Sequence, residues 1–183
     1  RHGDASDLSD LDDGSFDLVM SFFGAMFAPR PYDVAKEMVR VARPGGRIVM
    51  GNWIPGDPTL VAQLLKVSSA YSPPPPDGFV SPMTWGVADE VLARFGAAGV
   101  PDARVSLEPD TFVFDLSTPP AAFARTFRDY YGPTMKAFEA AATDGRADDL
   151  LAELEALFEE QNRAPDGSTT SIPATFLRVT VDV

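Results

Sequence analysis

The chain has 183 residues, with no cysteine and a single histidine, His2. Without cysteine, disulfide bonds and thiolate chemistry are excluded, and one histidine gives neither a zinc ligand set nor a Ser-His-Asp arrangement. We expect His2 to be a solvated residue near the chain start rather than a general base. The sequence therefore predicts no metal site and identifies no catalytic residue.

Basic residues are scarce, with 15 Lys and Arg against 27 Asp and Glu, which gives a net charge of −12. This charge repels polyanions, so we expect no nucleic-acid partner. No apolar run approaches the roughly 20 residues that span a bilayer, so we expect no membrane association. The lack of cysteine suits a reducing compartment, and we expect a cytoplasmic location.

Residues 13–53 have the pattern of a strand, a helix and a second strand. Residues 16–20 form a short apolar run typical of a strand buried on both faces. Between 33 and 42 the apolar residues recur at helical spacing, and the Pro-Gly-Gly sequence at 44–46 ends that helix. Residues 47–53 are the second strand. The short helical connection favours parallel pairing of the two strands in an α/β sheet.

The sequence changes character after residue 54. A weak helix at 59–69 is followed by a proline-rich stretch at 72–78, and we expect segment 55–87 to form a cap or lid. Further helices are expected at 87–99, 119–142 (with a break at Gly132-Pro133) and 146–161. Further strands are expected at 102–116, with a kink or bulge at 108–110, and at 176–183. We treat the chain as one domain, divided into 1–54, 55–87 and 88–183.

Four motifs together resemble class I S-adenosylmethionine-dependent methyltransferases, and most closely the small-molecule group related to the ubiquinone and menaquinone methyltransferases. They are GDA at 3–5, DGSFDLVMSFFGAMF at 13–27, VRVARPGG at 39–46 and RIVMGNW at 47–53. The resemblance implies a Rossmann-like open twisted sheet, mostly parallel with a terminal antiparallel strand pair. It also implies helices on both faces and a helical, proline-rich cap.

The chain departs from this family at its start. The glycine-rich loop and the acidic residue that ends the family's second strand have no counterpart, and no GxGxG pattern occurs among the 183 residues. We therefore expect the N-terminal strands of the fold to be missing and this chain to be about the last two-thirds of a parent methyltransferase. Cofactor binding by the chain alone is expected to be impaired.

The resemblance implies that Gly3, Asp4 and Ala5 bind the adenine part of S-adenosylmethionine. The Asp4 carboxylate would accept a hydrogen bond from the exocyclic amine, and the small Ala5 would leave room for the ring. The alternative for Asp4 is a solvated position in an acidic loop.

Ser21, Phe22 and Phe23 follow the first strand, at the carboxyl edge where open sheets bind ligands. Their backbone is a candidate contact for the cofactor's amino group, and their rings for the sulfonium cation. Core packing is the alternative for at least one phenylalanine, because neighbouring side chains face opposite ways. Asn52 and Trp53 end the second strand, and Trp53 either contacts substrate or plugs the core.

An aromatic stripe that includes Tyr130 and Tyr131 follows helical spacing. Core packing is the ordinary explanation of such a stripe, and a phenol that faces substrate is the alternative for one tyrosine.

The expected function is methyl transfer from S-adenosylmethionine to a small-molecule acceptor. The alternatives are a non-catalytic, truncated Rossmann-like association module and a nicotinamide-dependent oxidoreductase. An unpaired edge on the strand at 16–20 would be prone to association. We therefore expect the chain to form a homodimer, to swap segments, or to require its missing N-terminal portion.

Overall fold

The computed structural model describes residues 3–183, so His2 lies outside the described residues. Contacts divide the chain into two compact units. The sheet unit comprises Arg1–Pro55, Gly78–Asp110 and Phe176–Val183, and the helical unit comprises Gly56–Asp77 and Thr111–Thr175. These units interleave along the chain and do not follow the consecutive segments 1–54, 55–87 and 88–183, whose assignment as core, cap and C-terminal half of one domain stays a prediction.

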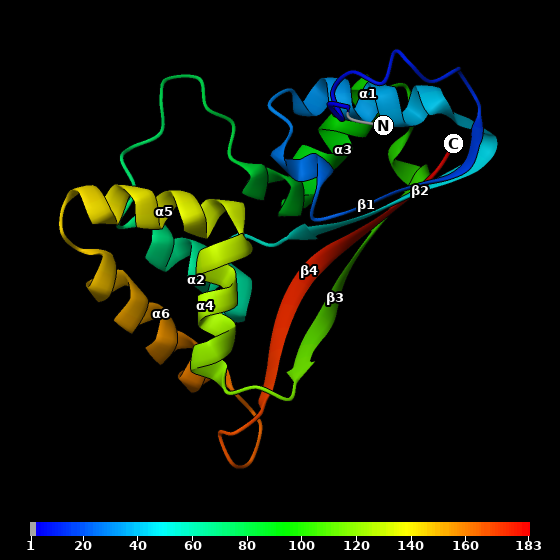
Figure 1. The fold of residues 1–183 in the computed structure, drawn as a ribbon. Coiled ribbons are helices and arrows are strands. Elements are labelled where there is room, and N and C mark those ends of the chain that lie inside the picture. The colour runs from blue at the N-terminus through cyan, green and yellow to red at the C-terminus, as the bar shows by residue number, and fades with distance from the viewer. Residues whose placement is uncertain (1–2) are drawn as a thin grey trace. The chain divides into compact units, whose positions relative to one another are not determined.

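Figure 1 shows the helices and strands along the chain. The strands are β1 (Phe16–Phe22), β2 (Ala42–Trp53), β3 (Val105–Leu116) and β4 (Thr170–Asp182). The α-helices are α1 (Pro31–Val41), α2 (Leu60–Ser69), α3 (Ala88–Ala97), α4 (Pro120–Tyr130), α5 (Gly132–Thr143) and α6 (Ala147–Gln161). Short 3₁₀ helices are η1 (Ala25–Phe27), η2 (Pro82–Gly86) and η3 (Asp102–Arg104). Every expected helix is present, and β2 and β4 begin five and six residues earlier than expected.

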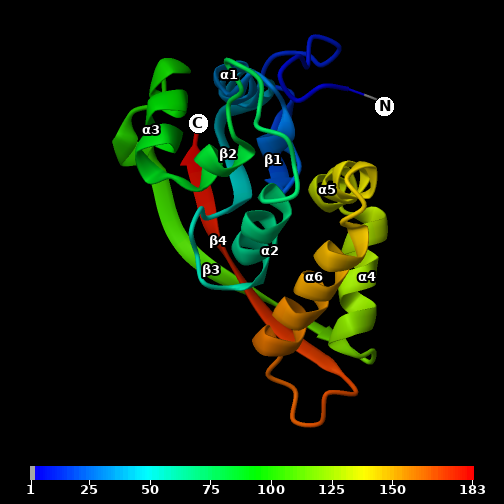
Figure 2. The ribbon, with the colours of Figure 1, turned by 90° about the vertical axis from the view of Figure 1, so that its left-hand side faces the viewer.

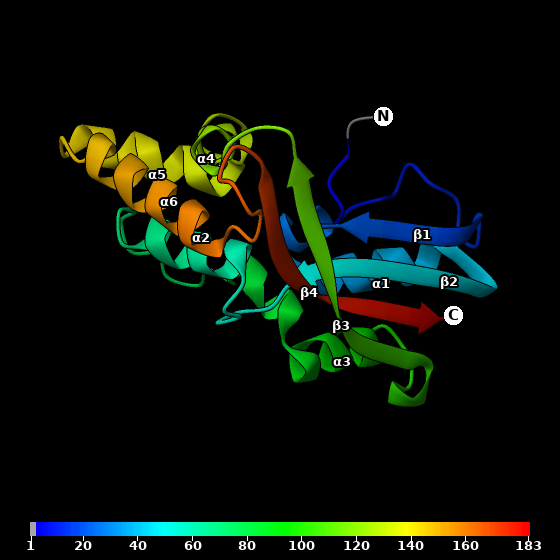
Figure 3. The ribbon, with the colours of Figure 1, turned by 90° about the horizontal axis from the view of Figure 1, so that it is seen from below.

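The four strands form one mixed sheet in the order β1-β2-β4-β3. Strand β1 pairs with β2 in parallel, with Val19 beside Ile48, and β2 pairs with β4 antiparallel, with Ile48 beside Val181. Strands β3 and β4 run in opposite directions (Figure 3). The predicted α/β, Rossmann-like class, with a parallel pair and a terminal antiparallel pair, is confirmed.

Helices cover one face of the sheet in the sheet unit. Ile48 and Met50 of β2 and Val179 and Val181 of β4 are fully buried on that face. Helix α1 packs there because Val34, Ala35, Met38 and Val41 form one apolar stripe, all buried. Pro31 begins the helix, and Gly45, with φ +80°, reverses the chain after it.

Strand β1 corrects a sequence expectation. We expected it to be buried on both faces, but Leu18, Met20 and Phe22 are 46%, 63% and 50% exposed. The expectation was wrong for the described residues, because β1 lies at the edge of their sheet and no element among residues 3–183 covers these side chains. These three side chains therefore point to an open face.

Strand β3 runs unbroken through Glu108-Pro109-Asp110 as one strand of 12 residues. The kink or bulge that the sequence suggested there stays a prediction. Proline is tolerated because β3 lies at the other edge of the sheet, where one side of the strand needs no hydrogen-bond donor. Arg178 of β4 forms ion pairs with Glu108 and Asp110, which hold the two strands together.

The helical unit gathers α2, α4, α5 and α6 (Figure 2). Apolar residues of all four helices and of β4 share one core, which includes Leu60, Phe123, Ala137, Leu150, Leu154, Phe158 and Ile172. The predicted break at Gly132-Pro133 is confirmed, because α5 begins at Gly132. Among residues 3–183, no helix has the length and apolar character needed to cross a membrane.

Gly86, at the end of η2, lies directly against the last residue of β2. A Cβ atom at Gly86 would fall 2.1 Å from the Trp53 carbonyl oxygen and 2.8 Å from the Ile54 Cα. A real side chain there forces the backbone of η2 away from β2. Gly96, inside α3, is the matched control because a Cβ atom there meets nothing within 4 Å.

We predict that Gly86→Ala lowers the free energy of unfolding by about 3 kcal/mol, because backbone cannot yield as a flexible side chain does. Gly96→Ala should raise it by about 0.5–1 kcal/mol, since alanine favours the helix. Urea unfolding followed by circular dichroism measures both changes. Equal stability of the two variants would contradict the close packing of η2 on β2.

Candidate functional site

The carboxyl ends of β1 and β2 meet at one edge of the sheet because the strands are parallel. Ser21 lies beside Met50, and Phe22 beside Gly51. We call this region the carboxyl edge and define it as Ser21–Gly24 and Gly51–Trp53. The loop that leaves β1 and the end of β2 are held together there, since the Phe23 amide donates a hydrogen bond to the Gly51 carbonyl at 2.9 Å.

Ser21 shapes the loop after β1. Its hydroxyl oxygen accepts a hydrogen bond from the Ala25 amide at 2.9 Å, which satisfies one of the first backbone donors of η1. The side chain is therefore engaged in holding the turn. The contact that the sequence suggested, to the amino group of a cofactor, would come from the backbone of this loop.

An aromatic cluster of Phe22, Phe23, Trp53 and Phe176 covers the carboxyl edge. The Phe23 ring stacks on Trp53 with ring centres 3.7 Å apart and planes 4° from parallel. Phe176 of β4 presents its edge to Phe23 at 5.4 Å. Trp53 is thus buried within the protein's own aromatic rings, while Phe22 remains half exposed. A substrate contact by Trp53 stays a prediction.

Two backbone features make this cluster possible. Gly51 carries no side chain, and a Cβ atom there would lie 2.7 Å from the Phe22 ring. Phe23 has φ +55°, and it is the one non-glycine residue among residues 3–183 with positive φ. A bulky residue in this conformation is strained, and such strain clusters at functional sites. The hydrogen bond to Gly51 and the stack on Trp53 hold Phe23 in place.

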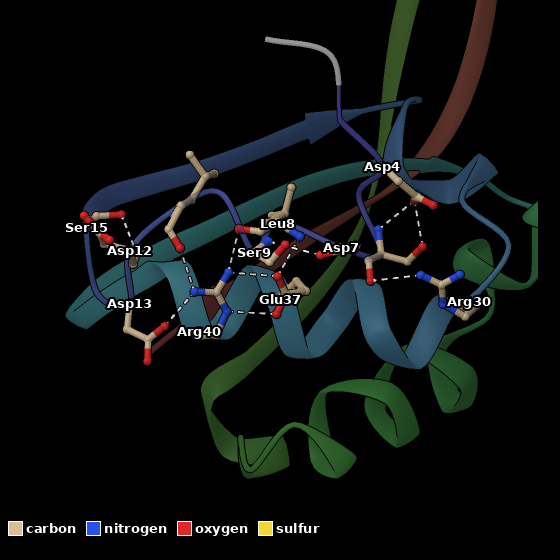
Figure 4. A network of polar contacts seen from close by, with 12 residues as sticks. Asp4, Asp7, Leu8, Ser9, Asp12, Asp13, Ser15, Arg30, Glu37 and Arg40 are labelled. Carbon is tan, nitrogen blue, oxygen red and sulfur yellow. Dashed lines mark hydrogen bonds and ion pairs between the residues drawn. The ribbon is translucent and has the colours of Figure 1, made fainter.

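A polar network holds the N-terminal loop, residues 4–13, against α1 (Figure 4). Arg40 donates hydrogen bonds to the carbonyls of Leu8 and Leu11, at 2.7 and 2.8 Å. Glu37 accepts one from the Leu8 amide at 2.7 Å, and Arg40 and Glu37 form an ion pair. Hydrogen bonding from Arg40, followed by that from Leu8, lowers the pKa of Glu37. The pair is therefore charged at neutral pH and clamps the loop.

Asp4 lies at the start of this loop and is exposed. Its Oδ1 accepts hydrogen bonds from the Ser6 hydroxyl at 2.6 Å and the Ser6 amide at 2.9 Å. These two bonds lower the pKa of Asp4, so the carboxylate is ionised at neutral pH. Gly3 is exposed and Ala5 half-buried beside it.

A cavity of about 410 Å³ opens between the loop and α1. Ser6, Asp7, Ser9, Asp33, Lys36, Glu37 and Arg40 line it. This lining is polar and charged, unlike the mostly apolar lining of pockets for drug-sized molecules. The lining begins at Ser6, directly after the Gly3–Ala5 segment, and includes no residue of the aromatic cluster.

Comparison with known proteins finds a match for the segment that contains the N-terminal loop and the β1 side of the carboxyl edge. Residues 1–50 match the family model of the methyltransferase domain. This match covers 50 of the 183 residues and shows what that segment is similar to. The resemblance to class I methyltransferases that the motifs indicated is confirmed.

Two curated relatives come from Mycobacterium tuberculosis and carry the names uncharacterized protein Rv1403c and uncharacterized protein Rv1405c. Rv1403c is 35% identical over 131 residues, which are 70% of this chain and 45% of the relative. Rv1405c is 34% identical over 128 residues, which are 69% of this chain and 44% of the relative. The chain thus spans about half the length of these relatives.

Solved structures show the same fold. A protein of Anabaena variabilis, assigned as a methyltransferase of an antibiotic biosynthesis pathway, superposes with a TM-score of 0.59 at 15% identity, over 100% of this chain and 72% of that one. A protein of Bacillus halodurans C-125, also assigned as a methyltransferase, gives a TM-score of 0.52 at 16% identity, over 99% of this chain and 69% of that one.

The structure brings Ser21, Phe22 and Phe23, which lie in the matched segment, to one edge with Trp53, which lies just beyond it. Gly3, Asp4 and Ala5 lie in the same sheet unit. Tyr130 and Tyr131 belong to the helical unit. Tyr130, at the end of α4, is 82% exposed, and the Tyr131 ring packs against Phe127 with centres 5.3 Å apart. Their role as substrate contacts stays a prediction.

Asn52 is a stronger feature of the carboxyl edge than its sequence position indicated. The side chain is 1% exposed, and within residues 3–183 neither its amide nitrogen nor its oxygen has a hydrogen-bond partner. Buried polar groups without partners are rare, and they mark places for water or a ligand. No periodicity or spacing in the sequence distinguishes this asparagine.

Arg94 of α3 is a positioning residue that the sequence gave no reason to choose. It is 1% exposed, lies 4.6 Å above the centre of the Trp85 ring, and donates to the Thr84 hydroxyl at 2.7 Å. Burial lowers its pKa. Because Thr84 and Trp85 are in η2, Arg94 ties α3 to η2. The partners belong to another element, so the helical periodicity of α3 does not indicate the contact.

The Glu37–Arg40 clamp makes the order of the N-terminal loop depend on pH. The folded-state pKa of Glu37 is below its ordinary value of 4.5, so its stabilising effect is complete above about pH 4.5 and is lost as the pH falls through the lower, folded-state value. We predict that the hydrogen-exchange protection factor of the Leu8 amide is constant from about pH 7 to 5 and falls below about 4.5.

Nuclear magnetic resonance measures this protection factor, with the Glu37→Gln variant as control. Glutamine does not titrate, so the variant should show lower protection at neutral pH and a smaller step in acid. An unchanged acid step in the variant would contradict the assignment of the clamp to Glu37.

Proposed function

We propose that a protein carrying this chain transfers a methyl group from S-adenosylmethionine to a small-molecule acceptor, and that this chain supplies the adenine side of the cofactor site. The match of residues 1–50 to the methyltransferase domain carries this proposal, because it spans both the Asp4 loop and the loop that leaves β1. In open α/β sheets, ligands bind outside the carboxyl ends of the strands.

The residues present suit the adenine side of such a cofactor. Asp4 is ionised and exposed, and both hydrogen bonds from Ser6 go to its Oδ1. Its Oδ2 is available to an amine donor of the ligand. The space around Gly3 is open, since a Cβ atom there would meet nothing within 4 Å. The unpartnered Asn52 amide at the end of β2 is a further polar group that a ligand can satisfy.

The aromatic cluster modifies one part of the expectation. We expected ring faces at Phe22 and Phe23 to attract the sulfonium cation. The Phe23 face that stacks on Trp53 is occupied, so a cation contact would use the backbone of residues 21–24 or another face. We propose that the stack keeps the strained loop in the conformation that binds the cofactor.

When bound, S-adenosylmethionine supplies a methyl group activated by the positive charge on sulfur. Such a displacement needs alignment and exclusion of water more than acid–base groups. This chain's own residues then bind and orient. Asp4 holds the adenine, and the loop at 21–24 lies near the donor. A small-molecule acceptor and a cytoplasmic location are parts of this proposal. So are substrate contacts by Trp53, Tyr130 or Tyr131.

The chain lacks one part of the family's cofactor site. None of the 183 residues forms the glycine-rich loop that holds the methionine part of the cofactor in this family. We expect the 183-residue chain to bind S-adenosylhomocysteine weakly, and a version extended upstream of Arg1 to bind it well. Isothermal titration calorimetry compares the two proteins directly.

Asp4→Asn in the extended version should weaken S-adenosylhomocysteine binding by about fivefold, because a neutral amide replaces a charged acceptor. Asp7→Asn is the matched control, since Asp7 also accepts a hydrogen bond from the serine two residues later, at 3.1 Å. The control should leave affinity within about twofold of the wild type. Equal weakening by both variants would contradict the role of Asp4.

A non-catalytic association module is the second candidate function. The open face of β1 and the lack of a glycine-rich loop favour it. Calorimetry separates the two candidates: no heat with S-adenosylhomocysteine in either the chain or its extended version would overturn the enzyme proposal.

A further inference from the structure

The chain passes between the sheet unit and the helical unit four times. It crosses between residues 55 and 56, 77 and 78, 110 and 111, and 175 and 176. The first two crossings lie in loops, and the last two lie inside strands β3 and β4. Any movement of one unit relative to the other must be absorbed by the backbone at these crossings.

The two crossings inside strands face each other across the β3–β4 ribbon. The strands are neighbours and run in opposite directions (Figure 3). Thr111 Oγ1 lies 3.2 Å from Thr175 Oγ1, and the Ser171 hydroxyl donates to Asp115 Oδ1 at 2.6 Å. Both contacts fit one antiparallel register, because 111 and 115 are as far apart in sequence as 171 and 175. In this register both strands cross between the same two rungs of the ladder.

The sheet narrows at this same point. Strand β2 pairs with β4 from Asp182 to Phe176. From Thr175 to Thr170, β3 is the one strand beside β4 among residues 3–183. A two-stranded ribbon twists more strongly than a wider sheet, and alone it is only marginally stable. The ribbon is therefore most easily bent where it leaves the sheet unit.

Side chains on the near side of this point hold the ribbon to the sheet unit. Arg178 forms ion pairs with Glu108 and Asp110, the last β3 residue before the crossing. The Phe176 ring presents its edge to Phe23, with ring centres 5.4 Å apart. The last rungs before the crossing thus belong to the sheet and its carboxyl edge.

Side chains on the far side hold the ribbon to the helical unit. The Thr175 amide donates a hydrogen bond to Thr59 Oγ1, directly before α2, at 2.8 Å. The Phe114 ring packs on Phe123 of α4, with ring centres 5.1 Å apart. Thr175 and Phe176 are consecutive residues, yet their contacts tie them to different units.

The two loop crossings each place a glycine with positive φ at the boundary. Gly56 has φ +75° and Gly78 has φ +79°. A Cβ atom at either position would meet nothing within 4 Å. Glycine adopts positive and negative φ with similar ease, and hinges are a few loop residues that absorb changes in φ and ψ. Both loops can therefore follow a bend of the ribbon.

We infer that the helical unit moves as one body relative to the sheet unit, about a hinge made of the β3–β4 ribbon at 110–111 and 175–176 and of Gly56 and Gly78. Movements of this kind take microseconds to milliseconds. In many enzymes they admit a substrate and then exclude water. The hinge follows from the chain path and the contacts alone, so it does not depend on the proposed function.

Pairs of spin labels measure the movement, because the chain has no cysteine of its own. Lys36→Cys/Glu160→Cys places one label on each unit. Lys36→Cys/Asp102→Cys places both labels on the sheet unit, and Asp144→Cys/Glu160→Cys places both on the helical unit. All four positions are exposed, so the labels do not disturb a core. Double electron–electron resonance gives the distribution of distances for each pair.

We expect the pair across the units to give a distribution at least about twofold broader than either pair within a unit. Gly56→Ala/Gly78→Ala should narrow it, since alanine has fewer accessible backbone conformations. Gly145→Ala/Gly167→Ala is the matched control and should leave it unchanged. Both of these glycines have positive φ and open space around them, and both lie inside the helical unit. Circular dichroism checks the fold of every variant.

Each of three results would overturn the hinge. A distribution across the units as narrow as the other two would show one rigid body. A distribution equally broad within the helical unit would assign the movement to loosening of that unit. Equal effects of the two alanine pairs would exclude Gly56 and Gly78 as hinge points.

Discussion

The parallel pairing of β1 with β2 is the constraint on which the rest of the sheet unit depends. It sets the register that places Phe22 beside Gly51 and lets the Phe23 amide bond to the Gly51 carbonyl. It thereby brings the strained loop after β1 against the end of β2. If the register slipped by one residue, every side chain of β1 would change face and the aromatic cluster could not form.

The same pairing makes the two sides of β1 different. The inner side of β1 is satisfied by β2, and the loop at its carboxyl end is held by Ser21 and Trp53. Its outer side and its open face have no partner among residues 3–183.

Local patterns in the sequence predicted the elements well. Apolar residues at helical spacing predict a helix with one buried face. Val34 and Met38 are buried on α1 in this way, and Leu154 and Phe158 on α6. The Pro-Gly-Gly turn predicted the chain reversal after α1. These signals depend on neighbours in sequence, which the sequence displays directly.

Features that depend on distant partners were not readable. The apolar run of β1 matches a strand buried on both faces, and composition does not reveal that one face stays open. Proline is tolerated at position 109 because β3 is an edge strand. Edge position is a property of the sheet's topology, which the local sequence does not display. The stack of Phe23 on Trp53 joins residues far apart in the sequence, and the contact of Arg94 with η2 joins two separate elements.

Hydrogen exchange measured by mass spectrometry, on the version extended upstream of Arg1, tests most directly whether the carboxyl edge is half of the cofactor site. The account predicts that S-adenosylhomocysteine slows exchange in the peptides that contain residues 3–6 and 21–24, and leaves α6 unchanged. Binding that protects neither of these two segments would contradict it.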